Sequence, residues 1–329
     1  MGEHRARATH AVLADAERGS SERTACDAIA RVVVGRSPLL QASIDGAMSA
    51  LPPVGAADGV DADGATVWRA VVRATSAAVC RAGAAAKGVP LYEYLACLAG
   101  RERPLLPVPC FRVAPSADAA TTPSSGGGAR RDCVIHADGA RSFSAAMRAS
   151  SELYRAAAPC GDDEQRAPGR QRGGAAADAD AAFAALAAGC ETPDCGGAYV
   201  GGADDDEVLQ PDRIATVSEA VEWSAARRQR GRALLTVSHR PGEPDDAFAA
   251  ELAVGLNAAR IEFAAVPCGS GALCEGNSWL CRFHQFRRVE AELGGEWSYE
   301  ENYYAAVVAG GEGNATLRSG NAAGGGVLR

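Results

Sequence analysis

The segment from Leu235 to Leu256 constrains the fold more than any other part of the chain. It reads L-T-V-S-H-R-P-G-E-P-D-D-A-F-A-A-E-L-A-V-G-L. The short apolar run from Ala233 to Val237 predicts a buried strand. Three polar residues, Ser238, His239 and Arg240, follow it directly. Because (β/α) barrels build their sites at such strand ends, the segment predicts an α/β protein with a site at this position.

Helices are predicted on both sides of this strand. The following helix has two acids in its first turn and an apolar face of residues spaced four apart: Asp245, Asp246, Phe248, Leu252 and Leu256. Before the strand, Thr216 to Glu219 has the pattern of a capping box, and the helix that it opens closes near Arg227 to Gly231. Helix, strand, loop and helix at this spacing are typical of α/β folds.

Further helices are predicted nearer the N-terminus. The alanine-rich run from Thr66 to Lys87 stops at Gly88, and a short helix from Leu91 to Leu98 has Gly100 as its stop. Residues 1 to about 105 therefore read as mostly helical.

Several stretches of the chain resemble enolase, the glycolytic phosphopyruvate hydratase. The most specific is Val237 to Leu256, which is similar to the family's V-S-H-R-S-G-E loop and to its following T-E-D-T-F-I-A-D-L-V-V-G-L helix. Other stretches resemble family segments in the same order along the chain: Ala77–Tyr92, Leu106–Phe111, Gly139–Tyr154, Ile214–Ala220, Val266–Cys268 and Arg282–Leu293. On this resemblance the chain is identified as a truncated and divergent member of the family.

The resemblance implies an α/β fold in which an enolase-like, incomplete (β/α) barrel follows a truncated, mostly helical N-terminal α+β domain. We expect residues 1–105 to be the helical part of that first domain, residues 106–293 the incomplete TIM barrel, and residues 294–329 a flexible tail. A complete barrel needs about 250 residues and eight strands. Low-complexity stretches stand where several of those strands are expected: Ala114–Ala129, Ala156–Ala182 and Cys190–Asp206.

Composition excludes some classes of function. The net charge of -8 and the pI near 5.3 argue against a nucleic-acid partner. The basic clusters Arg130–Arg131 and Arg166–Arg172 lie in stretches that read as solvated loops. No apolar run has the length of a membrane span, and Met1 to Arg5 lacks the apolar core of a signal peptide. We therefore expect a soluble, cytoplasmic protein with no membrane partner.

The 11 cysteines include no C-x-x-C pair. Cys190 and Cys195, and Cys268 with Cys274 and Cys281, have spacings that fit no common zinc pattern. We prefer free thiols in a reducing cytosol to a zinc site.

The resemblance places the acid and base of the reaction. The family's base is a lysine at a strand end, and Gln210 stands at that position. An amide has no usable basicity, so the proton-abstracting step loses its catalyst. The acid of the family's G-D-E-G-G turn corresponds to Asp163, and a neighbouring family glutamate corresponds to Asp132. Both aspartates have an alternative reading as solvated loop carboxylates.

The family holds Mg²⁺ with three carboxylates from successive strand ends. The resemblance supplies a match for the last of them alone, Asp204 or Asp205. Asp204 is the implied metal ligand, and its alternative reading is part of a solvated acidic run. The implied Mg²⁺ site is incomplete.

The resemblance also places the substrate-binding residues. Ser238, His239 and Arg240 match the family's S-H-R, while Pro241 replaces the serine that follows. His239 is either a residue that lines the substrate or a structural hydrogen-bonding residue. Glu262 stands where the family has a second lysine, and its negative charge would repel the substrate carboxylate.

Two functions remain open from the sequence. The family reaction is the Mg²⁺-dependent dehydration of 2-phosphoglycerate to phosphoenolpyruvate in glycolysis, and the replaced residues predict that this activity is weak or lost. The alternative is a non-catalytic, enolase-like protein that forms a homodimer or associates with another enolase chain. A third reading is a degenerate copy with no stable fold.

Overall fold

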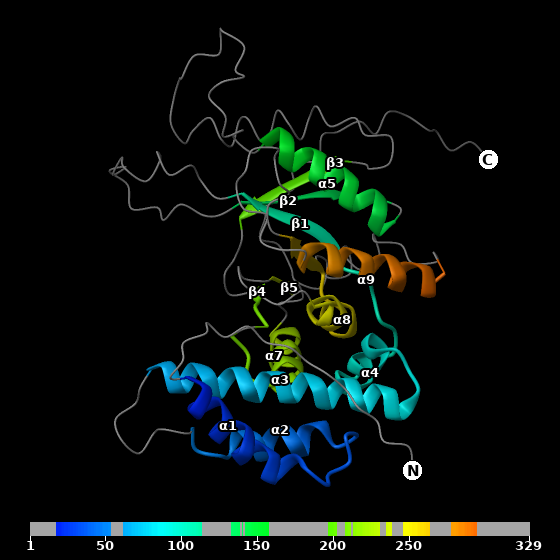
Figure 1. The fold of residues 1–329 in the computed structure, drawn as a ribbon. Helices are drawn as coiled ribbons and strands as arrows, with labels where there is room; N and C mark the ends of the chain where they lie inside the picture. Colours follow the sequence, from blue (N-terminus) through cyan, green and yellow to red (C-terminus); the bar gives the residue numbers. More distant parts are fainter. Residues whose placement is uncertain are drawn as a thin grey trace, which may run out of the picture.

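The computed structural model of the chain describes residues 18–53, 62–113, 133–138, 140, 142–157, 197–202, 208–211, 213–230, 235–238, 246–263 and 278–294. The helices are α1 (Arg18–Val33), α2 (Gln41–Ser49), α3 (Ala62–Lys87), α4 (Leu91–Leu98), α5 (Phe143–Ala157), α7 (Val217–Gln229), α8 (Phe248–Gly255) and α9 (Ser278–Glu292). The strands are β1 (Val108–Val113), β2 (Cys133–Asp138), β3 (Gly197–Gly202), β4 (Val208–Leu209), β5 (Thr236–Val237) and β6 (Arg260–Phe263). Helices α1 to α3 lie at the lower end in Figure 1, below the sheet and its helices. Within these residues, no helix is long and apolar enough to cross a membrane.

The strands form one six-stranded sheet with the order β3-β2-β1-β6-β5-β4. Strands β1, β2 and β3 pair antiparallel, whereas β1, β6, β5 and β4 are parallel to one another. The parallel strands alternate with helices α7 and α8 in the sequence, which is the pattern of β-α units.

The sheet must be curved, because its two edge strands are close in the sequence. Only residues 203–207 separate Gly202, at the end of β3, from Val208, at the start of β4. Six Cα steps reach at most about 22 Å. The edges of a flat six-stranded sheet would lie about 24 Å apart before any displacement along the strands is added. The curved, largely parallel sheet with its helices confirms the expected α/β class with an incomplete barrel.

Strand β3 lies within Cys190–Asp206, one of the low-complexity stretches of the sequence. It pairs with β2 along its whole length, from Gly197 opposite Asp138 to Gly202 opposite Cys133. Tertiary pairing therefore makes a strand of a segment whose glycines disfavour one locally.

The helical part is organised around the long helix α3. Helices α1 and α2 pack on it through a separate apolar cluster that includes Ile29, Met48 and Trp68. Helix α3 ends where predicted, because Gly88 adopts φ +69° and the Val89 N–H donates to the Ala84 carbonyl at 3.2 Å. Helix α4 ends in the same way, with Gly100 at φ +63°. The predicted bounds of Leu91–Leu98 are confirmed.

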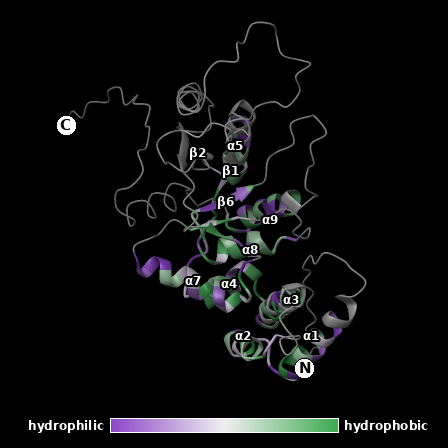
Figure 2. Ribbon diagram, turned by 90° about the vertical axis from the view of Figure 1, so that its left-hand side faces the viewer, coloured by the Kyte–Doolittle hydropathy of each residue, from purple (hydrophilic) through white to green (hydrophobic). Residues whose placement is uncertain are grey.

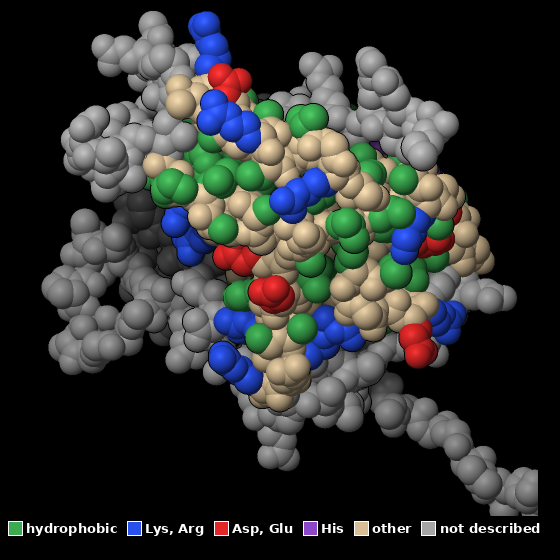
Figure 3. Space-filling view, turned by 90° about the horizontal axis from the view of Figure 1, so that it is seen from below, with side chains coloured by type: hydrophobic (Ala, Val, Ile, Leu, Met, Phe, Trp, Pro, Cys, Tyr) green, Lys and Arg blue, Asp and Glu red, His purple; other side chains and the backbone are tan. Residues whose placement is uncertain are grey.

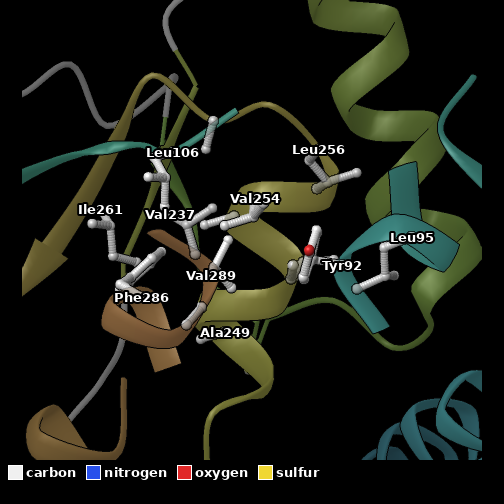
Figure 4. Close-up of a cluster of buried hydrophobic side chains, with 14 of the residues drawn as sticks. Tyr92, Leu95, Leu106, Val237, Ala249, Val254, Leu256, Ile261, Phe286 and Val289 are labelled. Atoms are coloured by element: carbon white, nitrogen blue, oxygen red, sulfur yellow. The ribbon is translucent and has the colours of Figure 1, made fainter. Parts of the chain in front are cut away.

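The main core lies between the sheet and helices α8 and α9. Val237 and Ile261 from the sheet meet Val254 from α8, and Phe286 and Val289 from α9 (Figure 4). Helix α8 differs from the amphipathic helix predicted: residues 249–255 are all buried, including Glu251. Helix α4 covers the side of α8 that the sequence pattern assigned to solvent. The two helices can approach closely because Gly255 of α8 has no side chain, and a Cβ at this position would collide with Leu95 of α4.

The N-terminus of α7 joins the helical part to the sheet part. The Asp45 carboxylate of α2 accepts hydrogen bonds from the Ser218 N–H at 3.0 Å and the Ser218 hydroxyl at 2.7 Å. The Ser76 hydroxyl of α3 accepts from the Val217 N–H at 2.9 Å. Both Asp45 and Ser76 are 1% exposed. Two helices thus satisfy in trans amides that any helix leaves unpaired at its start.

The predicted capping box supplies the remaining partners at this end of α7. The Thr216 hydroxyl accepts from the Glu219 N–H at 3.2 Å, as predicted. The Glu219 carboxylate accepts from the Ala215 N–H at 2.7 Å, one residue earlier than the N-cap. The box therefore forms with a one-residue offset.

Two arginines of α3 add further links across the same interface. Arg73 donates from Nε to the Ile214 carbonyl at 2.8 Å. Arg81 forms an ion pair with Asp246 at 2.6 Å and lies 5.1 Å from the centre of the Phe248 ring. Asp246 also accepts from the Phe248 N–H at 2.9 Å, and it lies one residue before Ala247, the N-cap of α8, instead of in the first turn of the helix. Helix α3 is therefore fixed to the sheet part at several points along its length.

We predict that Asp45→Ala lowers the free energy of unfolding by about 3 kcal/mol, because it removes the acceptor of the half-buried Ser218 N–H and hydroxyl and one of the acceptors of the buried Gln41 amide. Glu222→Ala, an exposed change on α7, is the matched control and should alter stability by less than about 0.5 kcal/mol. Urea unfolding measures both. Equal, small effects of the two substitutions would show that the hydrogen bonds of Asp45 at the start of α7 contribute little to stability.

Glu251 is a buried acid where α8 meets α4 and α9. It is 6% exposed, and its Oε1 accepts a hydrogen bond from Gln285 Nε2 at 2.6 Å. Its Oε2 has no hydrogen-bond partner among the described residues. Burial raises the pKa of Glu251 to about 7, against an opposing effect of Arg288. The protonated form is therefore favoured in the folded protein.

Glu251 makes stability fall as pH rises. Because the folded pKa lies above the unfolded value, the native state binds more protons between about pH 4.5 and about pH 7, and stability declines through that window by up to about 3 kcal/mol. Glu251→Gln should therefore be more stabilising at about pH 8 than at about pH 5. Urea unfolding of both proteins at the two pH values checks this. A wild-type to variant difference that does not change with pH would contradict it.

Candidate functional site

The parallel strands bring several predicted residues to one level of the sheet. Gln210 follows β4 and Ser238 follows β5, and the register pairs Leu209 with Val237 just before them. The Ser238 N–H donates to the Leu209 carbonyl at 3.0 Å. On the next strand, Val237 pairs with Ile261, so Glu262 of β6 lies beside Ser238. The carboxyl ends of parallel strands meet in this way in barrel active sites.

The row of residues that lie beside one another across the sheet continues onto β1 and β2. Glu262 is in register with Cys110 of β1. Phe111 pairs with Ile135, so the next pair of the antiparallel ladder is Cys110 with His136. One row across the sheet is thus formed by five side chains: Gln210, Ser238, Glu262, Cys110 and His136.

This row lies on the face opposite the main core. Successive residues of a strand point to opposite faces, and Val237 and Ile261 point to the helices. The other face of the same strands carries Thr236 and Ser238 on β5, and Arg260 and Glu262 on β6. We call this the polar face, and its residues are Cys110, His136, Gln210, Thr236, Ser238, Arg260 and Glu262. Hydrophilic colour marks β6 beside the hydrophobic colour of α8 in Figure 2.

The polar face is deeply buried. Thr236, Ser238, Arg260 and Glu262 are 3%, 2%, 5% and 8% exposed, in that order, and Gln210 is half-buried. The Gln210 Oε1 has no hydrogen-bond partner among the described residues. Side chains held here act in a low dielectric, where each charge matters more than it would in water.

His136 is neutral at physiological pH. Burial, together with the nearby charge of Arg260, lowers the pKa of His136 to about 3. Its Nδ1 lies 3.5 Å from the Ala137 carbonyl oxygen. A neutral imidazole contributes no charge to the polar face.

The structure brings together three of the residues that the resemblance singled out, Gln210, Ser238 and Glu262. The other predicted site residues lie outside the described residues: Asp132, Asp163, Asp204, His239 and Arg240. Their roles stay predictions.

The chemistry of the described polar face differs from the predicted family site. Gln210 offers an amide, which cannot take a proton at neutral pH. Glu262 is the one carboxylate among the described residues of this face. Within the described part of the chain, no group of three or more His, Cys, Asp or Glu residues is arranged to hold a metal. Mg²⁺ needs several oxygen ligands, so the described residues do not fit a magnesium site.

Sequence reasoning missed Arg260, His136 and Cys110. A signal existed for Arg260, because Arg-Ile-Glu-Phe alternates polar and apolar residues from Arg260 to Phe263 and so places Arg260 on the same face as Glu262. His136 and Cys110 have no comparable signal, since only the antiparallel pairing of β1 with β2 sets them side by side.

Known proteins resemble this chain in the same region. Residues 206–307 match the family model described as "Enolase, C-terminal TIM barrel domain". The enolase of Eimeria tenella is 27% identical over 338 aligned residues, which cover 70% of this chain and 73% of that protein.

Shorter stretches are more similar to other enolases. The enolase of Mastigamoeba balamuthi is 42% identical over 79 residues, 24% of this chain and 17% of that protein. The enolase of Solanum lycopersicum is 36% identical over 92 residues, 28% of this chain and 19% of that protein. Together with the curved sheet and its helices, these similarities show that the chain is a divergent member of the enolase family.

Proposed function

We propose that this enolase-family protein has lost most or all of the family reaction, the Mg²⁺-dependent dehydration of 2-phosphoglycerate to phosphoenolpyruvate. The observation that carries the proposal is the pair of residues at the ends of β4 and β6. Gln210 and Glu262 occupy one row of the sheet, at positions where the resemblance places the family's two lysines.

Each replacement removes a distinct part of the reaction. A general base contributes about 10²- to 10⁴-fold to a rate, and the Gln210 amide cannot supply one. Glu262 reverses a charge that would neutralise the substrate carboxylate, and its burial keeps water from screening the repulsion. On the described polar face the substrate would thus meet the negative charge of Glu262, and an amide at the position of the family's base.

The remaining roles follow from the resemblance. We propose Asp163 as the acid, His239 as a further catalytic residue that lines the substrate, and Asp204 as a ligand of Mg²⁺. Ser238, Arg240 and Asp132 are the proposed substrate-binding residues, and Asp132 is the alternative acid. A metal held by one carboxylate binds weakly. A bound Mg²⁺ would stabilise negative charge on the substrate carboxylate. We place the protein in the cytoplasm, in line with the family reaction.

The test is turnover of 2-phosphoglycerate with Mg²⁺, followed by the ultraviolet absorbance of phosphoenolpyruvate. Wild-type protein should turn over at least about 10⁴-fold more slowly than a typical enzyme. The double variant Gln210→Lys/Glu262→Lys should bind 2-phosphoglycerate about 10-fold more tightly in calorimetry, because the repulsion is gone. Gln229→Lys, on the exposed end of α7, is the control for added charge. Wild-type turnover at ordinary enzyme rates would contradict the proposal.

A second candidate is a non-catalytic partner role, and one observation favours it. The turn between α1 and α2 exposes three apolar side chains, Val34 at 78%, Leu39 at 44% and Leu40 at 55%. The face seen from below the helical part carries hydrophobic side chains among charged ones (Figure 3). Such a surface suits association with a second copy or with another enolase chain. Sedimentation equilibrium of the purified chain tests this, since a monomer at all concentrations contradicts self-association.

A further inference from the structure

Arg260 is a buried cation on the polar face. Its side chain belongs to β6 and the residue is 5% exposed. Its Nε has no hydrogen-bond partner among the described residues. Within the same residues, the ion pairs of the structure do not include Arg260. Among the described residues, this guanidinium, which is always charged, therefore lies in the interior without an ion-pair partner.

The positive charge is not offset by its described neighbours. Burying an unpaired charge costs several kcal/mol. Glu262 lies two positions along the same strand, about 7 Å away between Cα atoms, and does not pair with Arg260. His136, which feels the Arg260 charge, is neutral. The fold retains a cation whose cost an external anion would relieve.

Hydroxyl groups lie beside this cation. Thr236 of β5 is in register with Arg260 and is 3% exposed. Ser238 follows on the same face and is 2% exposed. A guanidinium with neighbouring hydroxyl donors is the arrangement that suits the oxygens of phosphate and carboxylate groups.

We propose that Arg260 binds a small oxyanion on the polar face, with the Thr236 hydroxyl as a second donor. The ligand is a metabolite that carries a phosphate or a carboxylate group. The carboxylate of Glu262 excludes the anion from the carboxyl-end side, so the anion lies at the level of Thr236 and Arg260, one row deeper than Gln210 and Ser238. The two residues that bind the anion, Arg260 and Thr236, are not among those assigned to the reaction, so this site is independent of the loss of turnover.

The experiment is thermal unfolding at constant ionic strength, with chloride replaced by inorganic phosphate in one arm and by malonate in another. Binding to the folded state alone raises the melting temperature. We expect wild-type protein to gain several degrees in at least one arm, and the arm that responds identifies the phosphate or the carboxylate. Arg260→Met should lose the gain and should melt higher than wild type without ligand, because an unpaired buried charge is removed.

Matched variants separate the site from general effects of salt. Arg230→Met, at an exposed position after α7, should keep the wild-type response. Thr236→Val keeps the side-chain shape and should reduce the response, which provides a second test if Arg260→Met does not fold. An equal gain in wild type and Arg260→Met, an unchanged gain in Thr236→Val, or no gain in wild type with either anion would overturn the proposal. Because the readout is stability, its failure says nothing about turnover.

Discussion

The buried carboxylate of Asp45 is the interaction on which the rest of the structure depends. It comes from α2 and accepts the N–H and the hydroxyl of Ser218 at the start of α7. Helix α7 leads into β5, and β5 sets the register of Gln210 and Glu262 on its two neighbours. A carboxylate at a helix N-terminus is stabilised by the unpaired amides and by the helix dipole. The helical part thus fixes the sheet edge that carries the candidate site.

The structure keeps the scaffold of the family while the described site has different chemistry. The links along α3, through Arg73, Ser76 and Arg81, use groups far from the polar face. They hold the strand ends in place whatever side chains those ends carry. Function depends on particular side chains that a fold carries, so a chain can keep its fold while those side chains change. On our proposal, Gln210 and Glu262 alter the chemistry of the site, while the strands that carry them stay paired with β5.

Local signals were enough to predict part of this structure. Gly88 and Gly100 end α3 and α4 because a positive φ costs glycine little, and the Thr216 cap follows from its own sequence. Gln210, Ser238 and Glu262 were found through resemblance, and strand register explains why they meet. What the sequence could not show depends on partners distant along the chain. Asp45 lies 173 positions from Ser218, and the burial of α8 on every side depends on α4.

The most direct measurement of the central claim follows the proton that enolases abstract. 2-Phosphoglycerate would be incubated with the protein and Mg²⁺ in deuterium oxide, and proton NMR would follow the signal of the hydrogen next to the carboxylate. If the protein abstracts this hydrogen, deuterium from the solvent replaces it and the signal is lost. The measurement therefore reports proton abstraction even when the dehydration does not go to completion. With Gln210 in place of a base, the signal should persist unchanged. Loss of that signal at ordinary enzyme rates, from protein free of other enolases, would contradict the account.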